Sequence, residues 1–205
     1  SINREKDSCY LNQFVAYAKA HNIAYQLGAV PAKTLPQIVE LYKDNKSLYI
    51  ANYQDRHESN NMDLNGLIDF KGAIKPEFGQ VRSFLNHHKY KSKDLKINIL
   101  KPSSRLKTDY PYHYSAVFKT SETPWSYQVP NPENSKLEWF LVKCDVYGNP
   151  LVMKSIGNNS KVHITIPEDF LNYKIILKYY YNGHVLTAVE SLNTQATSSD
   201  SDSSV

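Results

Sequence analysis

The chain has 205 residues, with 24 Lys and Arg against 20 Asp and Glu and a formal net charge of +4. A balance this close to neutral argues against nucleic acid as a ligand, because polyanion binding relies on an excess of positive charge. Hydrophobic residues make up 41% of the chain, and no apolar run approaches the roughly 20 residues of a membrane span. We therefore expect a folded chain of one large or two small domains, without a membrane span.

Before residue 90, apolar residues recur at helical spacing. Three such stripes predict amphipathic helices, at Leu11–Ala18, at Leu35–Tyr42 and from Lys75-Pro76 to Leu85, where proline suits the first turn. Two short apolar runs between them, Asn22–Leu27 and Ser47–Tyr53, predict buried strands. Helices that alternate with buried strands are typical of a parallel α/β sheet, so residues 1–90 are expected to form an α/β segment.

After residue 90 the apolar pattern changes to a period of two, which is typical of half-buried strands. The expected strands are Leu95–Leu100, Tyr112–Lys119, Leu137–Val146, Val162–Ile166, Tyr173–Tyr179 and His184–Ser191. Asn182-Gly183 between the last two predicts a tight hairpin. We expect an antiparallel sandwich over residues 91–194, with Trp139 in its core, followed by a flexible polar tail over residues 195–205.

The cysteines and histidines show no metal-binding spacing. Cys9 and Cys144 lie far apart, and neither has a zinc-ligand partner nearby. Each is expected to be a buried free thiol, with one bridge between them as the alternative. His87 and His88 are adjacent, and neighbouring side chains on a helix diverge, which favours a solvated helix end over a shared metal ion. We expect no metal and no cofactor.

Three segments carry a family pattern: YIANYQDRHES from Tyr49, NGLIDFKG from Asn65 and KPEFGQVR from Lys75. They resemble the end of the catalytic barrel in the β-galactosidase and β-glucuronidase superfamily of glycoside hydrolases. In that family a last barrel strand, a loop and a final helix often precede an all-β domain. The resemblance implies an α+β chain, in which an N-terminal α/β segment like the last units of a (β/α)8 barrel is followed by an immunoglobulin-like antiparallel β-sandwich.

The resemblance also implies that the chain is not catalytic alone. A complete barrel needs roughly 250 residues, so this chain would supply only the last part of one. A retaining glycosidase needs two carboxyl groups about 5 Å apart, and the position that matches the family's nucleophile holds the amide of Gln26. We therefore expect an incomplete catalytic carboxylate pair and a partner chain that completes the barrel.

Charged residues after the second predicted strand are the main candidates for substrate binding. Under the barrel interpretation, Asp55, Arg56, His57 and Glu58 lie at the face where loops hold substrate. Carboxylates accept hydrogen bonds from sugar hydroxyls, and the Arg guanidinium donates them in a fixed fork. The alternative is a solvated loop with local ion pairs. An acid/base pair of Asp55 and Glu58 is a third interpretation, which no spacing supports.

Aromatic residues add two candidates. The chain has 16 Tyr and two Trp, and the C–H face of a sugar packs well on an aromatic ring. Tyr53 ends the predicted strand beside the charged residues, and Trp125 lies in the loop-like segment TPWSY. The alternative is that both residues serve packing, with Tyr53 in a core and Trp125 in a core or at a domain interface.

The favoured function is the C-terminal part of a carbohydrate-active glycoside hydrolase in polysaccharide degradation. It would contribute the substrate loop and an accessory sandwich, with an oligosaccharide or polysaccharide as ligand. The expected location is extracellular or periplasmic, and association with a surface is left open. The alternative is a non-catalytic carbohydrate-binding or protein-interaction module.

Overall fold

The computed structural model describes residues 13–24, 50–58, 61–86 and 95–192. Residues 13–20 and α3 (Pro76–Leu85) are helical, which confirms the first and third predicted helices within a few residues. The helix predicted at Leu35–Tyr42 and the tail at residues 195–205 lie outside the described residues, as do Cys9, Gln26 and most of the strand predicted at Asn22–Leu27. The described part of the chain is mostly antiparallel sheet with two short helices, and none of its helices is long and apolar enough to cross a membrane.

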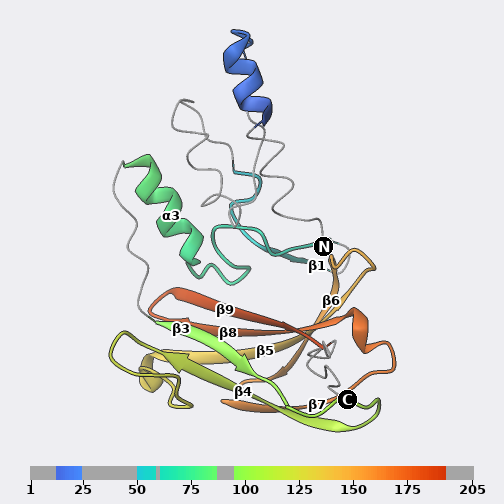
Figure 1. The fold of residues 1–205 in the computed structure, drawn as a ribbon. Helices are drawn as coiled ribbons and strands as arrows, with labels where there is room; N and C mark the ends of the chain where they lie inside the picture. The colour runs from blue at the N-terminus through green and yellow to red at the C-terminus, as the bar shows by residue number, and fades with distance from the viewer. Residues whose placement is uncertain (1–12, 25–49, 59–60, 87–94, 193–205) are drawn as a thin grey trace, which may run out of the picture.

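Two antiparallel sheets form the larger part of the molecule (Figure 1). The first has three strands in the order β3 (Lys96–Leu100), β4 (Pro111–Lys119) and β7 (Lys161–Thr165). The second has four, in the order β6 (Pro150–Gly157), β5 (Ser135–Cys144), β8 (Tyr173–Tyr181) and β9 (His184–Ser191). Single turns of 3-10 helix at Pro132–Asn134 and Phe170–Asn172 lie in the connections.

The core lies between these sheets, because alternate residues of each strand point inward. Trp139, Ile175, Leu177 and Tyr179 are fully buried there, together with Phe118 of the facing sheet. The indole Nε1 of Trp139 donates to the backbone oxygen of Asn159 at 2.7 Å. This satisfies the one polar group of a buried Trp and confirms its predicted place in the core.

The tight hairpin predicted at Asn182-Gly183 is confirmed. Both residues have positive φ, 46° for Asn182 and 73° for Gly183, as a two-residue turn of the favoured hairpin type requires. All six predicted strands of this region are present within a few residues, but β6 was missed. It is an edge strand that begins at a proline, and its neighbouring Leu151 and Val152 are both exposed, so its sequence has no alternation.

The segment before residue 87 differs from the parallel α/β unit that the sequence predicts. Residues 50–53, the described part of the predicted strand Ser47–Tyr53, form no strand of the named sheets. The chain instead makes a small antiparallel hairpin of β1 (Arg56–Glu58) and β2 (Asn61–Asp63). Short apolar runs do not distinguish a strand from an irregular buried segment, and here an isolated bridge from Gln54 to Ile68 takes the place of a ladder.

This segment lies on the outer face of the four-stranded sheet, the face turned away from the three-stranded sheet (Figure 1). The amide of Ile74 donates to the backbone oxygen of Gly183 at 2.8 Å, and the amide of Val185 donates to the oxygen of Ile74 at 2.9 Å. Backbone hydrogen bonds thus attach the loop before α3 to the β8–β9 hairpin. The sheet therefore buries both of its faces.

Candidate functional site

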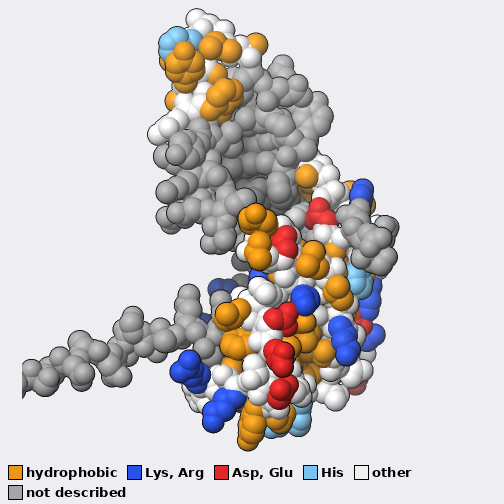
Figure 2. All heavy atoms as spheres, turned by 90° about the vertical axis from the view of Figure 1, so that its right-hand side faces the viewer, with side chains coloured by type: hydrophobic (Ala, Val, Ile, Leu, Met, Phe, Trp, Pro, Cys, Tyr) orange, Lys and Arg blue, Asp and Glu red, His pale blue; other side chains and the backbone are white. Residues whose placement is uncertain are grey.

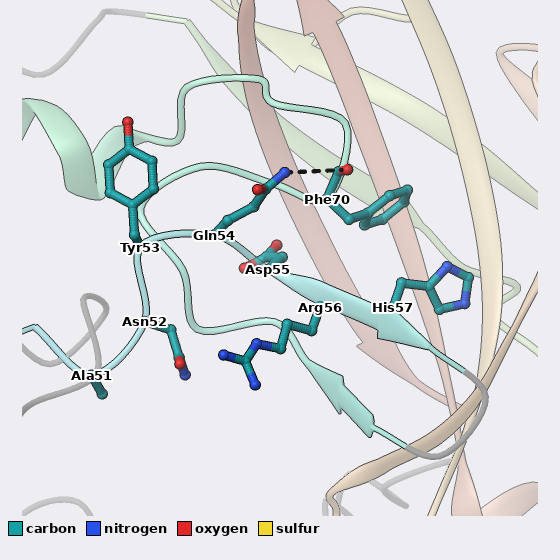
Figure 3. A pocket seen from close by; sticks show the side chains of 8 residues that line it. All are labelled: Ala51, Asn52, Tyr53, Gln54, Asp55, Arg56, His57 and Phe70. Atoms are coloured by element: carbon teal, nitrogen blue, oxygen red, sulfur yellow. Dashed lines mark hydrogen bonds between the residues drawn. The ribbon is translucent and has the colours of Figure 1, made fainter.

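An open pocket of about 570 Å³ lies along the backbone that enters β1. Its lining is one continuous stretch, residues 51–57, with Phe70 from the loop after β2. Figure 3 shows the Arg56 and Asn52 side chains on one side of this stretch, and the His57 ring on the other side near Phe70. Four of the six residues predicted to bind substrate, Tyr53, Asp55, Arg56 and His57, therefore line one pocket.

The remaining two predicted residues do not join them. Trp125 is 47% exposed on the loop between β4 and β5, and it is not among the residues that line this pocket. Glu58 ends β1, and its side chain lies outside the described part of the structure. The proposed pairing of Asp55 with Glu58 as acid and base therefore has no geometry to support it. Tyr53 is 64% exposed, which excludes its alternative place in a core.

Asp55 differs from its neighbours because it is buried. Its Oδ1 accepts hydrogen bonds from the Gly66 amide at 2.8 Å and from the Lys75 ammonium at 2.9 Å. Burial raises the pKa of Asp55, and Lys75 with Gly66 offsets only part of that effect. The contact requires glycine at position 66, because a Cβ there would lie 2.4 Å from the Asp55 amide nitrogen. Asp55 therefore holds the loop in place rather than facing a ligand.

A second buried carboxylate, Asp69, joins the same segment to the sandwich. It is fully buried, and its Oδ2 accepts from the Tyr180 hydroxyl at 2.6 Å and from the Lys178 ammonium at 3.3 Å, both on β8. Its Oδ1 accepts from the amides of Lys71 at 2.8 Å and Ala73 at 2.9 Å. Burial alone would raise the pKa of Asp69, but the hydroxyl, the amides and Lys178 together lower it.

Glu138 on β5 adds a further polar contact between the segment before residue 87 and the sandwich. The Lys71 ammonium lies 2.5 Å from Glu138, and the Lys136 ammonium lies 2.8 Å from it. Burial alone would raise the pKa of Glu138, but these two lysines lower it. Beside them, Phe70 packs on Phe140 with ring centroids 6.1 Å apart, and the Lys178 ammonium lies 4.2 Å from the Phe70 centroid. Phe70 thus belongs both to the pocket and to this interface.

The sequence alone does not predict these ion pairs, of which only that of Asp69 with Lys178 is fully buried. Asp69 lies inside the segment NGLIDFKG, but Lys178, Tyr180 and Glu138 lie about 70 to 110 positions further along the chain. One local feature of the sequence points to such pairs. Lys178 interrupts the apolar run of β8, and Glu138 interrupts that of β5. A charge inside a strand that is buried on both faces needs a partner.

The pocket offers binding groups rather than reactive ones. Its one lining carboxylate, Asp55, is engaged by Lys75, and the described side chains contain no group of three or more His, Cys, Asp or Glu placed to hold a metal. Cys144 of β5 is a buried free thiol in the cluster against which Phe70 packs, and burial raises its pKa, so it is not a reactive thiolate. The exposed side chains of Tyr53, Arg56 and His57 are available to a ligand.

Comparison of the chain with family models, curated proteins and solved structures finds no match.

Proposed function

We propose that the chain is the C-terminal part of a carbohydrate-active glycoside hydrolase, which supplies a substrate-binding loop and an accessory sandwich but is not catalytic alone. One observation carries the proposal: Tyr53, Arg56 and His57, which the sequence predicts to bind substrate, line a single open pocket whose loop Asp55 holds in place. An extracellular or periplasmic location belongs to the same proposal.

The chemistry of the pocket fits a sugar. The Tyr53 ring is largely exposed and offers an apolar face, while the Arg56 guanidinium offers five donors in a planar fork. Hydroxyl groups of a sugar accept from such a fork, and its C–H face packs on such a ring. An open, mostly polar hollow suits a chain-like ligand better than a small enclosed one.

The order of the strands supports the proposal for the sandwich. Lettered A, B, C, C′, E, F and G in chain order, the sheets read A-B-E and C′-C-F-G. Immunoglobulin-like domains also divide their strands between two sheets in this manner. We propose an immunoglobulin-like sandwich, and a barrel end before it whose missing strands and second catalytic carboxylate come from a partner chain.

The proposal is tested by titrating the full chain with neutral and acidic oligosaccharides, followed by NMR or calorimetry. We expect Arg56→Ala to weaken the best ligand at least about tenfold, because it removes a charged donor pair. Tyr53→Ala should weaken it by a similar or smaller factor. Tyr147→Ala is the matched control, since Tyr147 is 79% exposed on the β5–β6 turn and does not line the pocket.

Two results would contradict this function. Binding of no oligosaccharide would favour a protein-interaction module, and binding that survives both Arg56→Ala and Tyr53→Ala would move the site elsewhere, with Trp125 as the next position to change. The same purified chain should release no product from aryl glycosides. Turnover would mean that a complete carboxylate pair is present in the chain.

A further inference from the structure

Two histidines that lie 50 positions apart in the sequence meet on the outer face of the three-stranded sheet. His113 of β4 and His163 of β7 are direct partners in the antiparallel register. Their ring centroids are 4.0 Å apart and their planes are inclined by 81°. Both side chains are exposed, because their neighbours Tyr112, Tyr114, Val162 and Ile164 point into the core.

This arrangement suits chelation. An imidazole nitrogen binds a transition-metal ion at about 2.0–2.1 Å, so two imidazoles on one ion have ring centroids roughly 5 Å apart. The observed rings need to open by only about 1 Å, by rotation of two exposed side chains. The strand register already holds the two Cβ atoms together, so little ordering remains to be done on binding.

The surroundings leave the site accessible. Pro111 and Ser115 flank His113 on the same face, and their register partners on β7 are Thr165 and Lys161. Among these residues, Lys161 carries a positive charge that opposes binding of a cation.

We propose that His113 and His163 form a surface site for a divalent transition-metal ion, with two protein nitrogens as ligands and water in the other positions. Imidazole is a good ligand for Cu²⁺, Ni²⁺ and Zn²⁺, and the usual order of affinities places Cu²⁺ first. The described residues hold no third His, Cys, Asp or Glu grouped with this pair, so the site is open. It is independent of the proposed carbohydrate pocket.

The test is a Cu²⁺ titration of the full chain, followed by calorimetry and by electron paramagnetic resonance. His87→Ala and His88→Ala are introduced first, because this adjacent pair is a second candidate for adventitious binding. We expect one equivalent of Cu²⁺ with two nitrogen ligands in this background. His113→Ala and His163→Ala should each weaken binding at least about tenfold, since each removes a direct ligand. Lys161→Gln should strengthen it about twofold, because it removes a nearby positive charge.

His21→Ala is the matched control, since it also removes an exposed imidazole, lies outside the pocket and should leave the Cu²⁺ affinity unchanged. His113→Asn provides a second variant at the same position, and thermal unfolding of each variant shows that the sheet is intact. An affinity within about twofold of the background in both His113→Ala and His163→Ala would overturn the proposal. A loss in only one of the two would overturn the two-nitrogen site.

Discussion

The two faces of the four-stranded sheet are both buried, but by different means. On the inner face, Ile175, Leu177 and Tyr179 of β8 pack in an apolar core against the second sheet. On the outer face, Ile176 of the same strand lies beside Lys178 and Tyr180, which bind Asp69 of the loop before α3. Apolar packing is not directional, whereas a buried ion pair requires one particular partner at one position.

The comparison shows which part of the molecule defines the pocket. The inner core stabilises the sandwich regardless of which segment covers the outer face of the four-stranded sheet. The outer face accepts only a segment that brings Asp69 to Lys178 and Lys71 to Glu138. Asp55, bound to Lys75 in the same segment, then holds the backbone of the pocket. The sandwich therefore positions the candidate binding loop through charges rather than through contact with a ligand.

On the face that Figure 2 shows, acidic, basic and apolar side chains are interspersed, without one large area of a single charge. Such a surface gives no electrostatic preference for a polyanion. The charges that matter most for the fold are those buried under the loop.

The largest expected effect comes from removing the covering segment. A fragment that lacks residues 1–90 exposes Phe140, Val142 and Ile176 and leaves Lys178 without Asp69. We expect it to self-associate at micromolar concentration in sedimentation experiments, because an apolar sheet face is uncovered. The same fragment with Phe140→Ser and Ile176→Thr should be monomeric. If the unmodified fragment is monomeric and as stable as the full chain, the outer face needs no cover.

The next effect is the loss of one buried charge. Asp69→Ala leaves Lys178 buried without its partner, and we expect the free energy of unfolding to fall by about 3–5 kcal/mol in a urea titration. Asp69→Ala combined with Lys178→Met should recover most of this loss, since no charge is then unpaired.

The control for that experiment is an exposed ion pair. The Lys101 ammonium lies 3.3 Å from Glu190 and is largely exposed, so Lys101→Ala should cost less than about 1 kcal/mol. Leu177→Ala, in the inner core, should cost about 2–5 kcal/mol. A cost for Asp69→Ala no larger than that for Lys101→Ala would show that the ionic contact does not stabilise the fold.

The smallest effect is the dependence on pH. The folded pKa of Asp69 is lowered from 3.8 and that of Glu138 from 4.5, so the stability that they contribute is present above these values. It is lost as the pH falls through the lower folded values. The folded pKa of Asp55 is raised, so protonation of Asp55 favours the folded state and partly opposes this loss.

Thermal unfolding between about pH 5 and pH 2 measures how these opposing contributions to stability add up. Asp69→Asn should reduce the loss of stability in acid, and Asp55→Asn should increase it, because the two shifts have opposite signs. Equal acid profiles for both variants and the unmodified chain would contradict these directions.

Much of the sandwich was predictable from local pattern. Strand β7 and the first part of β4 alternate exposed and buried residues, and the Asn182-Gly183 turn has the positive-φ conformation that joins β8 closely to β9. The helix at Pro76–Leu85 has a proline at its first residue. The edge strand β6 has none of these signals, and its pairing with β5 is what makes it a strand.

The sequence by itself determined the period of the sandwich strands other than β6, the Asn182-Gly183 turn and the residue types that enter the pocket, because these follow from neighbours a few positions apart. Four candidate residues line one pocket because they lie within five positions of the chain. Tertiary structure alone decided that residues 50–58 and 61–63 form an irregular segment with an antiparallel hairpin rather than a parallel strand. It also brought Asp69 to Lys178 and His113 to His163, since the register between distant strands depends on how whole faces pack, which no local pattern contains.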